Sequence, residues 1–180
     1  MEAHIFAEGS STTADDNNLP IKEYYQGLFG MVSGLNDELE EYIDTELHIL
    51  SEEYGVINGY ECMSDIQESQ NEPVGDDKTV SIAKHELLRV AENADVMVIL
   101  LSADIFRSTV TEIWDELVAA ARPNSIWCFG AARSALNELN FENLEAKDCS
   151  VLTYQRVGVA RIGSDTRDEL LERVKQKAGQ

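Results

Sequence analysis

Hydroxyl groups and arginines follow several apolar runs of this sequence, at the points where buried strands would end. In "LHILSEEYGVING" (47–59), an apolar run ends at Ser51, and a tyrosine and a glycine follow within four residues. In "VMVILLSADIFRSTV" (96–110), another run ends at Ser102, and an arginine and a second serine follow. Hydroxyls and arginines, together with backbone N–H groups at helix N-termini, form anion sites, so this pattern suits a phosphate or a nucleotide. The candidate ligand-binding residues are Ser10, Ser51, Tyr54, Gly55, Ser102, Arg107, Ser108, Arg156 and Arg161.

These residues also have architectural explanations. Tyr54 could pack at the edge of the core, and Gly55 could provide the positive φ of a turn. Arg107 could lie along the helix that it precedes, with only its charged end in water. For Ser51 and Tyr54 we favour a role in lining a site.

Common catalytic and metal-binding motifs are absent from the sequence. It contains no G-x-G-x-x-G, no P-loop and no G-x-S-x-G. His4, His48 and His85 stand apart from one another, no Cys/His group has zinc spacing, and His48 is expected to be packed within a strand. We therefore expect no metal and no cofactor, and the sequence leaves open whether the protein is an enzyme.

The elements that would position the candidate residues alternate between apolar strands and helices. The predicted strands are 3–7, 46–50, 95–101, 124–130 and 149–154, with 157–163 also strand-like. The helical stretches are 23–44, which its glycines could divide in two, and 79–94, 108–121, 132–139 and 164–178. This alternation predicts one α/β domain over residues 1–180, with a three-layer, mostly parallel five-stranded sheet and helices on both faces, a Rossmann-like fold.

Ligands bind beyond the carboxyl ends of the strands in such sheets. This rule selects the loops 8–13, 51–60, 102–108 and 130–133, and the segment 154–161 could join them. The polar segment 61–78 contains Pro73 and Gly75 and is expected to be a mobile excursion.

The charge of the chain is unusual. It carries 34 acids and 14 bases, a net charge of −20, and residues 1–100 alone account for −18. Ordinary small domains carry a net charge of roughly 2 to 8 in magnitude. We interpret the acid excess as adaptation to a very salty cytoplasm, the alternative being an acidic binding face or a nucleic-acid mimic. An odd number of cysteines, no signal sequence and no run of about 18 apolar residues predict a cytoplasmic protein that does not bind membranes.

Three elements of the chain resemble, in order, the YaaA-like peroxide-stress family and its small relatives of unknown function. "EYYQGLF" (23–29) is similar to the Y-x-G-L element of the family, and "LHILSEEYGVING" to its strand that runs into L-S-x-x-Y-G-V-L. "VMVILLSADIFRSTV" is similar to its strand that leads into A-S-x-E-Y-F-K-S-V. The late segment "VLTYQRVGVARIG" is similar to an aromatic and basic segment of the family, with Tyr154, Arg156 and Arg161 at the matching positions.

The chain also departs from this family. Its first predicted strand leads into "FAEGSSTT", where the family has a loop with proline and lysine, and the chain is shorter than full-length members. The resemblance implies an α/β fold and an intracellular, stress-linked, DNA-binding role, without a defined reaction.

Three functions remain open from the sequence. The first is a stress- or defence-linked protein that binds nucleic acid or a nucleotide at the carboxyl ends of the strands. The second is an enzyme of glycosylase or ribosyl-transfer type that acts on a nucleoside, nucleotide or base. The third is a non-catalytic module whose acidic half binds a basic protein. The oligomeric state is not determined by the sequence.

Overall fold

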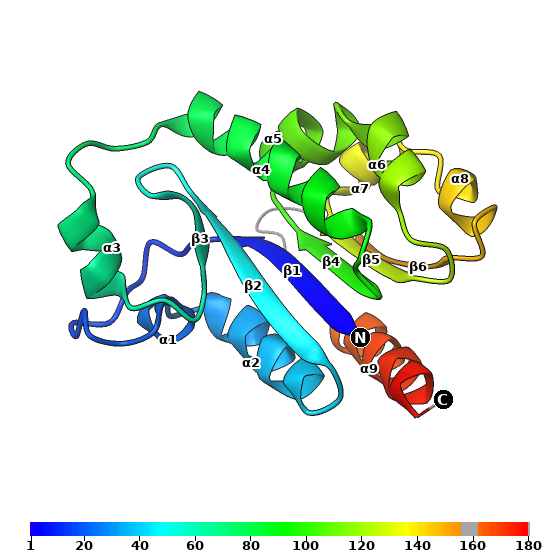
Figure 1. Cartoon of the computed structure of the whole chain (residues 1–180), viewed down its shortest axis with the longest axis horizontal. Coiled ribbons are helices and arrows are strands. Elements are labelled where there is room, and N and C mark those ends of the chain that lie inside the picture. The colour runs from blue at the N-terminus through cyan, green and yellow to red at the C-terminus, as the bar shows by residue number, and fades with distance from the viewer. Residues whose placement is uncertain (156–161, 180) are drawn as a thin grey trace.

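A mostly parallel β-sheet forms the centre of the molecule (Figure 1). The computed structural model describes residues 1–155 and 162–179. The strands, in sheet order, are β3 (Gly55–Asn58), β2 (Asp44–Ser51), β1 (Glu2–Glu8), β4 (Val96–Leu100), β5 (Ile126–Ala131) and β6 (Ser150–Gln155). All neighbouring pairs are parallel except β2 and β3.

The sheet has six strands in the described residues, so the prediction of five was wrong. The additional strand is β3, which forms an antiparallel hairpin with β2 and pairs Ser51 with Gly55. The predicted loop 51–60 therefore contains a turn and a short edge strand. A four-residue strand carries too little alternation in its sequence to be recognised before its partner is known.

Helices cover both faces of the sheet, as the predicted three-layer arrangement requires (Figure 1). One face is covered by α1 (Ile21–Tyr24), α2 (Phe29–Glu40), α3 (Met63–Ser69) and α9 (Ser164–Ala178). The other is covered by α4 (Asp76–Ala91), α5 (Ala103–Phe106), the π-helical turn η1 (Arg107–Thr111), α6 (Trp114–Ala120), α7 (Arg133–Leu136) and α8 (Glu142–Glu145). Each face has its own apolar core, because both faces of the central strands are buried.

Several helix boundaries differ from the predicted ones. The first helical stretch divides as expected, with Gly27 at φ +68° between α1 and α2. The helix expected at 108–121 begins earlier, after Ser102, and passes through η1 before α6. The segment 61–78 contains α3 and the first residues of α4, while its mobility stays a prediction. No helix in the described part of the chain is long and apolar enough to cross a membrane.

Candidate functional site

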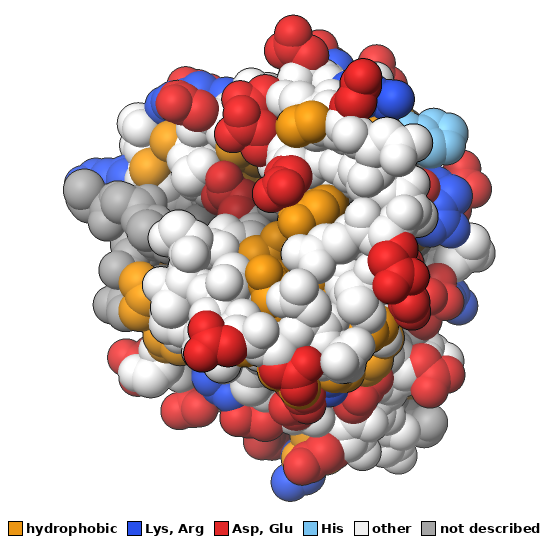
Figure 2. Space-filling model, turned by 90° about the vertical axis from the view of Figure 1, so that its left-hand side faces the viewer, with side chains coloured by type: hydrophobic (Ala, Val, Ile, Leu, Met, Phe, Trp, Pro, Cys, Tyr) orange, Lys and Arg blue, Asp and Glu red, His pale blue; other side chains and the backbone are white. Residues whose placement is uncertain are grey.

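A pocket of about 510 Å³ opens at the carboxyl ends of β1 and β2. Its walls come from the end of β1 and the loop that follows, from Tyr24 and Tyr25 at the end of α1, from the β2–β3 turn, and from the start of α4. Figure 2 views the molecule from this side and shows a hollow with hydrophobic side chains at its base and acidic side chains around it. The pocket therefore opens at the edge of the sheet where the sequence placed its candidate residues.

The loop after β1 is fitted closely to Tyr25. A Cβ added at Gly9 would lie 2.8 Å from Cζ of Tyr25, so only glycine leaves room for this ring. The Gly9 N–H donates to the Leu50 carbonyl (3.1 Å), which ties the loop to β2. The Thr12 N–H donates to the Ser10 hydroxyl (3.1 Å), so Ser10 both lines the pocket and stabilises the loop.

The β2–β3 turn uses Ser51 and Tyr54 in two ways. The Tyr54 N–H donates to Oγ of Ser51 (3.2 Å), which closes the turn, and Gly55 completes it at φ +82°. The Tyr54 hydroxyl accepts a hydrogen bond from Gln67 of α3 (3.2 Å). Both Ser51 and Tyr54 also line the pocket, whereas Gly55 is not part of its wall. The architectural and the site roles of this stretch are therefore combined in the same residues.

The start of α4 closes the pocket on one side. The Thr79 hydroxyl lies 3.0 Å from the Ser51 carbonyl and 2.8 Å from the Gly75 carbonyl, which fixes the first turn of α4 against the end of β2. Gly75 precedes the helix at φ +90°. Asp76 lies in the first turn and on the pocket wall, where its carboxylate complements the positive end of the helix dipole.

Ser102 has a protein partner in place of the expected anion. The Glu8 carboxylate, at the end of β1, accepts the Ser102 N–H (2.7 Å) and the Ser102 hydroxyl (3.0 Å). A protein carboxylate thus takes the position that the sequence assigned to a phosphate. Glu8 reaches Ser102 because β1 and β4 are parallel neighbours whose carboxyl ends meet. Ser102 is therefore a positioning residue for Glu8, which lines the pocket.

Arg107 and Ser108 point to other parts of the molecule. The Arg107 guanidinium donates to Glu138 (3.0 Å) and to the Ser134 hydroxyl of α7 (2.9 Å). The Ser108 hydroxyl donates to the Asp104 carbonyl (2.9 Å), one turn earlier in the helix. The structure therefore does not bring these two residues to the pocket. Arg156 and Arg161, together with the strand expected at 157–163 up to Arg161, lie outside the described residues.

The described wall of the pocket is acidic. Glu8, Glu52, Glu53 and Asp76 contribute to it, and no lysine or arginine among residues 1–155 and 162–179 does. Many of the described bases pair with acids elsewhere: Lys22 with Asp37, Lys84 with Glu112, Arg89 with Glu86, Arg122 with Asp95, Arg167 with Glu38, and Arg173 with Glu169. This wall attracts cations and hydrogen-bond donors and repels anions.

Three tyrosines supply the aromatic part of the wall. Tyr24 and Tyr25 meet edge to face with ring centroids 5.5 Å apart, and Tyr54 comes from the β2–β3 turn. Burial raises the pKa of the Tyr25 phenol above its ordinary value, and the nearby Ser51 hydroxyl offsets part of this rise. Burial likewise raises the pKa of Tyr54. Both phenols therefore stay neutral at physiological pH and can donate as well as accept.

Sequence reasoning missed Tyr24, Tyr25, Thr79 and Asp76 as pocket residues. The tyrosine pair was visible in "EYYQGLF", but its position beside the end of β1 depends on how the loop 9–18 folds back. The N–H of Ala14 donates to the Tyr24 carbonyl (2.8 Å), and the N–H of Gln26 donates to the Thr12 carbonyl (2.8 Å). A second cavity of about 340 Å³ lies on the other side of this loop, against α2.

A group of possible metal ligands lies on the sheet, away from the pocket. His4 and His48 were expected to stand apart, which was wrong: Nδ1 of His4 and Nε2 of His48 are 2.9 Å apart, and Glu46 is beside them. Adjacent parallel strands bring these residues together across 44 positions of the sequence. The expectation that His48 is packed is confirmed, since its side chain is buried.

Comparisons with known proteins found no matching family and a weak similarity to a solved structure. No family model matches the chain, and no curated protein matches it. A solved structure of 3-hydroxyisobutyrate dehydrogenase from Mycobacterium tuberculosis, with L-serine, is similar at a TM-score of 0.44 and 11% identity, over 99% of this chain and 52% of that one. This chain therefore spans about half the length of that protein.

Proposed function

We propose that this protein binds a nucleoside or a nucleobase in the pocket at the carboxyl ends of β1 and β2. The observation that carries the proposal is the composition of the described wall, which combines three tyrosines with carboxylates and hydroxyls and includes no lysine or arginine. Tyrosine rings provide flat surfaces on which a base stacks. Carboxylates accept hydrogen bonds from sugar hydroxyls, exocyclic amino groups and ring N–H groups.

The size and position of the pocket support this ligand class. Its volume of about 510 Å³ lies within the roughly 300 to 1,000 Å³ that is usual for small-molecule sites. It lies at the carboxyl edge of a parallel sheet, where α/β proteins of this architecture bind their ligands. Glu8 is held by two hydrogen bonds from Ser102, so its carboxylate is oriented before a ligand arrives.

The charge of the wall favours an uncharged ligand over a phosphate. A phosphate placed here would face several carboxylates, and the Ser102 donors that the sequence assigned to an anion are already bonded to Glu8. Nucleic-acid binding requires lysines or arginines that meet the phosphate backbone. The described bases named above are instead paired with acids. Of the functions considered from the sequence, the geometry therefore favours the one that involves a nucleoside or base.

The likeness to YaaA-like proteins, the stress-linked role and the binding of nucleic acid stay predictions from the sequence. They are compatible with a base-binding pocket, because proteins that act on DNA bases hold an extruded base in such a pocket.

Thermal unfolding in molar KCl tests the proposal. The ligands are the four common ribonucleosides, the free bases, the matching 5′-monophosphates and a short DNA oligomer. A ligand at one hundred times its Kd stabilises the native state by about 2.7 kcal/mol, which raises the Tm of a protein of this size by about 5 to 10 °C. We expect a nucleoside or base to give such a shift and its monophosphate a smaller one.

Two tyrosine variants make the test specific. Tyr24→Leu removes an aromatic face from the pocket and should abolish the shift, while Tyr42→Leu, an exposed residue outside the pocket, should retain it. If the native protein unfolds cooperatively and no nucleoside or base changes its Tm, the proposal is wrong. If only monophosphates or DNA stabilise it, the nucleotide or nucleic-acid hypothesis takes its place.

A further inference from the structure

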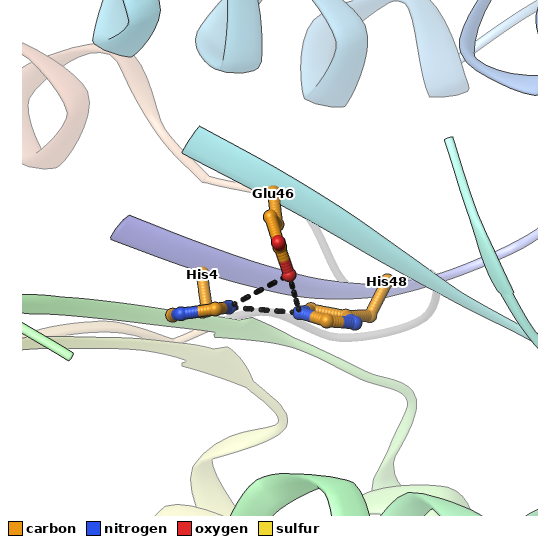
Figure 3. Close-up of side chains that lie close together, drawn as sticks. All are labelled: His4, Glu46 and His48. Atoms are coloured by element: carbon orange, nitrogen blue, oxygen red, sulfur yellow. Dashed lines mark hydrogen bonds and ion pairs between the residues drawn. The ribbon is translucent and has the colours of Figure 1, made fainter. Parts of the chain in front are cut away.

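His4, Glu46 and His48 form a compact group on one face of the sheet (Figure 3). His4 comes from β1, and the other two come from β2. The parallel register pairs His4 with Glu46 and Phe6 with His48, and the twofold alternation of strands places all four side chains on the same face. Figure 3 shows the two imidazoles edge to edge, with the Glu46 carboxylate above the point where they meet.

The group has a buried part and an open part. His4 is 3% exposed and His48 is 5% exposed, and the ring of Phe6 stacks on His48 with centroids 4.4 Å apart. The side chain of Glu46 is 53% exposed. Among the described residues, the short strand β3 pairs only with residues 48–51 of β2, and no further strand covers the edge of β2 at Glu46. Glu8 follows His4 by four positions along β1, so the group lies about 13 Å along this strand from the pocket.

We propose that His4, Glu46 and His48 bind one transition-metal ion through Nδ1, a carboxylate oxygen and Nε2, respectively. The three ligand atoms are separated by 2.9 Å (His4 to His48), 3.6 Å (His4 to Glu46) and 3.7 Å (His48 to Glu46). The circle through these atoms has a radius of about 2.0 Å, which equals the Zn–N and Zn–O bond lengths of protein sites. An ion at its centre is therefore within bonding distance of all three, and the exposed side leaves a position for water.

Nδ1 of His4 and Nε2 of His48 share a hydrogen bond, and a bound ion would replace the proton between them. Their centroids are 5.2 Å apart and their planes differ by 21°, so the facing nitrogens point at each other. An ion about 2.0 Å from each nitrogen lies off the line between them, on the Glu46 side, so binding requires both rings to turn about χ2, a broad torsion in histidine, until their lone pairs point at the ion.

The far nitrogen of His4 has a carboxylate next to it. Nε2 of His4 is buried and has no hydrogen-bond partner in the described part of the chain. Oε1 of Glu2 lies 3.3 Å away, close enough for a bond after a small realignment. A metal on Nδ1 requires the proton of neutral His4 to be on Nε2, facing Glu2. Metal-binding histidines usually donate their second N–H to a carboxylate or carbonyl in this way, which fixes the tautomer.

The types of ligand atom indicate which ions the proposed site would prefer, and the nearby charges are largely paired. Glu2 and Glu86 are two further acids near the group, and Arg89 of α4 is paired with Glu86 at 2.6 Å. Two imidazoles and one carboxylate suit Zn²⁺, Co²⁺ and Ni²⁺, whereas Mg²⁺ and Ca²⁺ prefer sites made of oxygen atoms. This preference distinguishes binding at the proposed site from binding to the acidic surface, because surface carboxylates attract every cation.

Titration of the untagged protein with Co²⁺ tests the proposal, in molar KCl and excess Mg²⁺ so that surface binding is suppressed. We expect one Co²⁺ per chain, with the visible absorption of a four-coordinate ion and displacement by Zn²⁺. Glu46→Gln, at a half-exposed position, should weaken binding at least tenfold while the protein stays folded, and His48→Gln should do the same. His85→Gln changes the exposed third histidine and should bind Co²⁺ as the native chain does.

Three results would overturn the proposal. The first is native protein that binds no Co²⁺ or Zn²⁺ at micromolar concentration. The second is an equal loss of affinity in His85→Gln, which would assign the binding to exposed imidazoles. The third is displacement of Co²⁺ by Mg²⁺, which would assign it to surface carboxylates.

Discussion

The contact between Glu8 and Ser102 joins the carboxyl ends of β1 and β4 and orients a carboxylate that lines the pocket, and its removal gives a quantitative test of the structure. Glu8→Ala removes the acceptor of two hydrogen bonds, at 2.7 and 3.0 Å, and leaves the Ser102 N–H without a partner. A hydrogen bond to a charged group contributes about 1.5 to 3 kcal/mol. Because Glu8 is only half-buried, we take the lower value for each bond and expect a loss of about 3 kcal/mol.

Three further variants separate the parts of this contact. Glu8→Gln keeps the shape, since its amide oxygen can accept the N–H and its NH₂ can donate to Oγ of Ser102, so it should cost about 1 kcal/mol. Ser102→Ala removes only the hydroxyl bond and should cost about 1.5 kcal/mol. The double variant Glu8→Ala/Ser102→Ala should cost no more than Glu8→Ala, because the hydroxyl bond is lost only once.

Urea unfolding in molar KCl measures these differences, with the exposed Glu68→Ala as a control that should stay within about 0.5 kcal/mol of the native chain. The reasoning would be refuted by a Glu8→Ala variant as stable as the control. It would also be refuted by equal losses in Glu8→Gln and Glu8→Ala, since the loss would then not depend on the two hydrogen bonds.

Three more predictions concern packing, cysteine reactivity and charge. Gly9→Ala should destabilise the protein by about 2 kcal/mol, because its Cβ would meet the Tyr25 ring at 2.8 Å. Gly30→Ala, which adds a methyl group in open space on α2, should stabilise the protein by about 0.5 to 1 kcal/mol. Equal effects of the two variants in chemical unfolding would contradict the close packing of the loop at Gly9. Burial raises the pKa of the Cys128 thiol to about 12, so this thiol stays protonated at pH 8. Native protein should therefore react with iodoacetamide at Cys62 first. Fast labelling of Cys128, detected by mass spectrometry, would contradict its burial. Raising KCl from 0.1 to 1 M shortens the screening length from about 10 to about 3 Å. This weakens the repulsion among the acids of a chain of net charge −20, so the Tm should rise. A Tm unchanged by KCl would contradict the interpretation of the acid excess as adaptation to salt.

Five of the six described strands, and the edge of the sheet at which the pocket opens, were predictable because they depend on local patterns. Runs such as "VMVIL" and "IWCFG" are apolar on both faces, which indicates buried parallel strands. In a parallel sheet the residues after successive strands gather at one edge, and Ser10, Ser51 and Tyr54 do line the same pocket.

The direction of a side chain on a helix was not predictable from its distance to a strand end. Arg107 follows β4 closely, but the π-helical turn η1 and the packing of α7 lead its guanidinium to Glu138 and Ser134. The short strand β3 was missed for a similar reason, because four residues become a strand only when β2 is beside them.

By itself, the sequence determined which segments are buried, which residues stand at the strand ends, and that the chain is strongly acidic. The tertiary structure decided which of these residues meet. Glu8 and Ser102 are 94 positions apart and His4 and His48 are 44 apart, and each pair forms only because β1 lies between β2 and β4 in one particular register. A shift of one residue in that register would turn these side chains to the opposite face of the sheet, so strand order and register, which no local pattern encodes, set the chemistry of both sites.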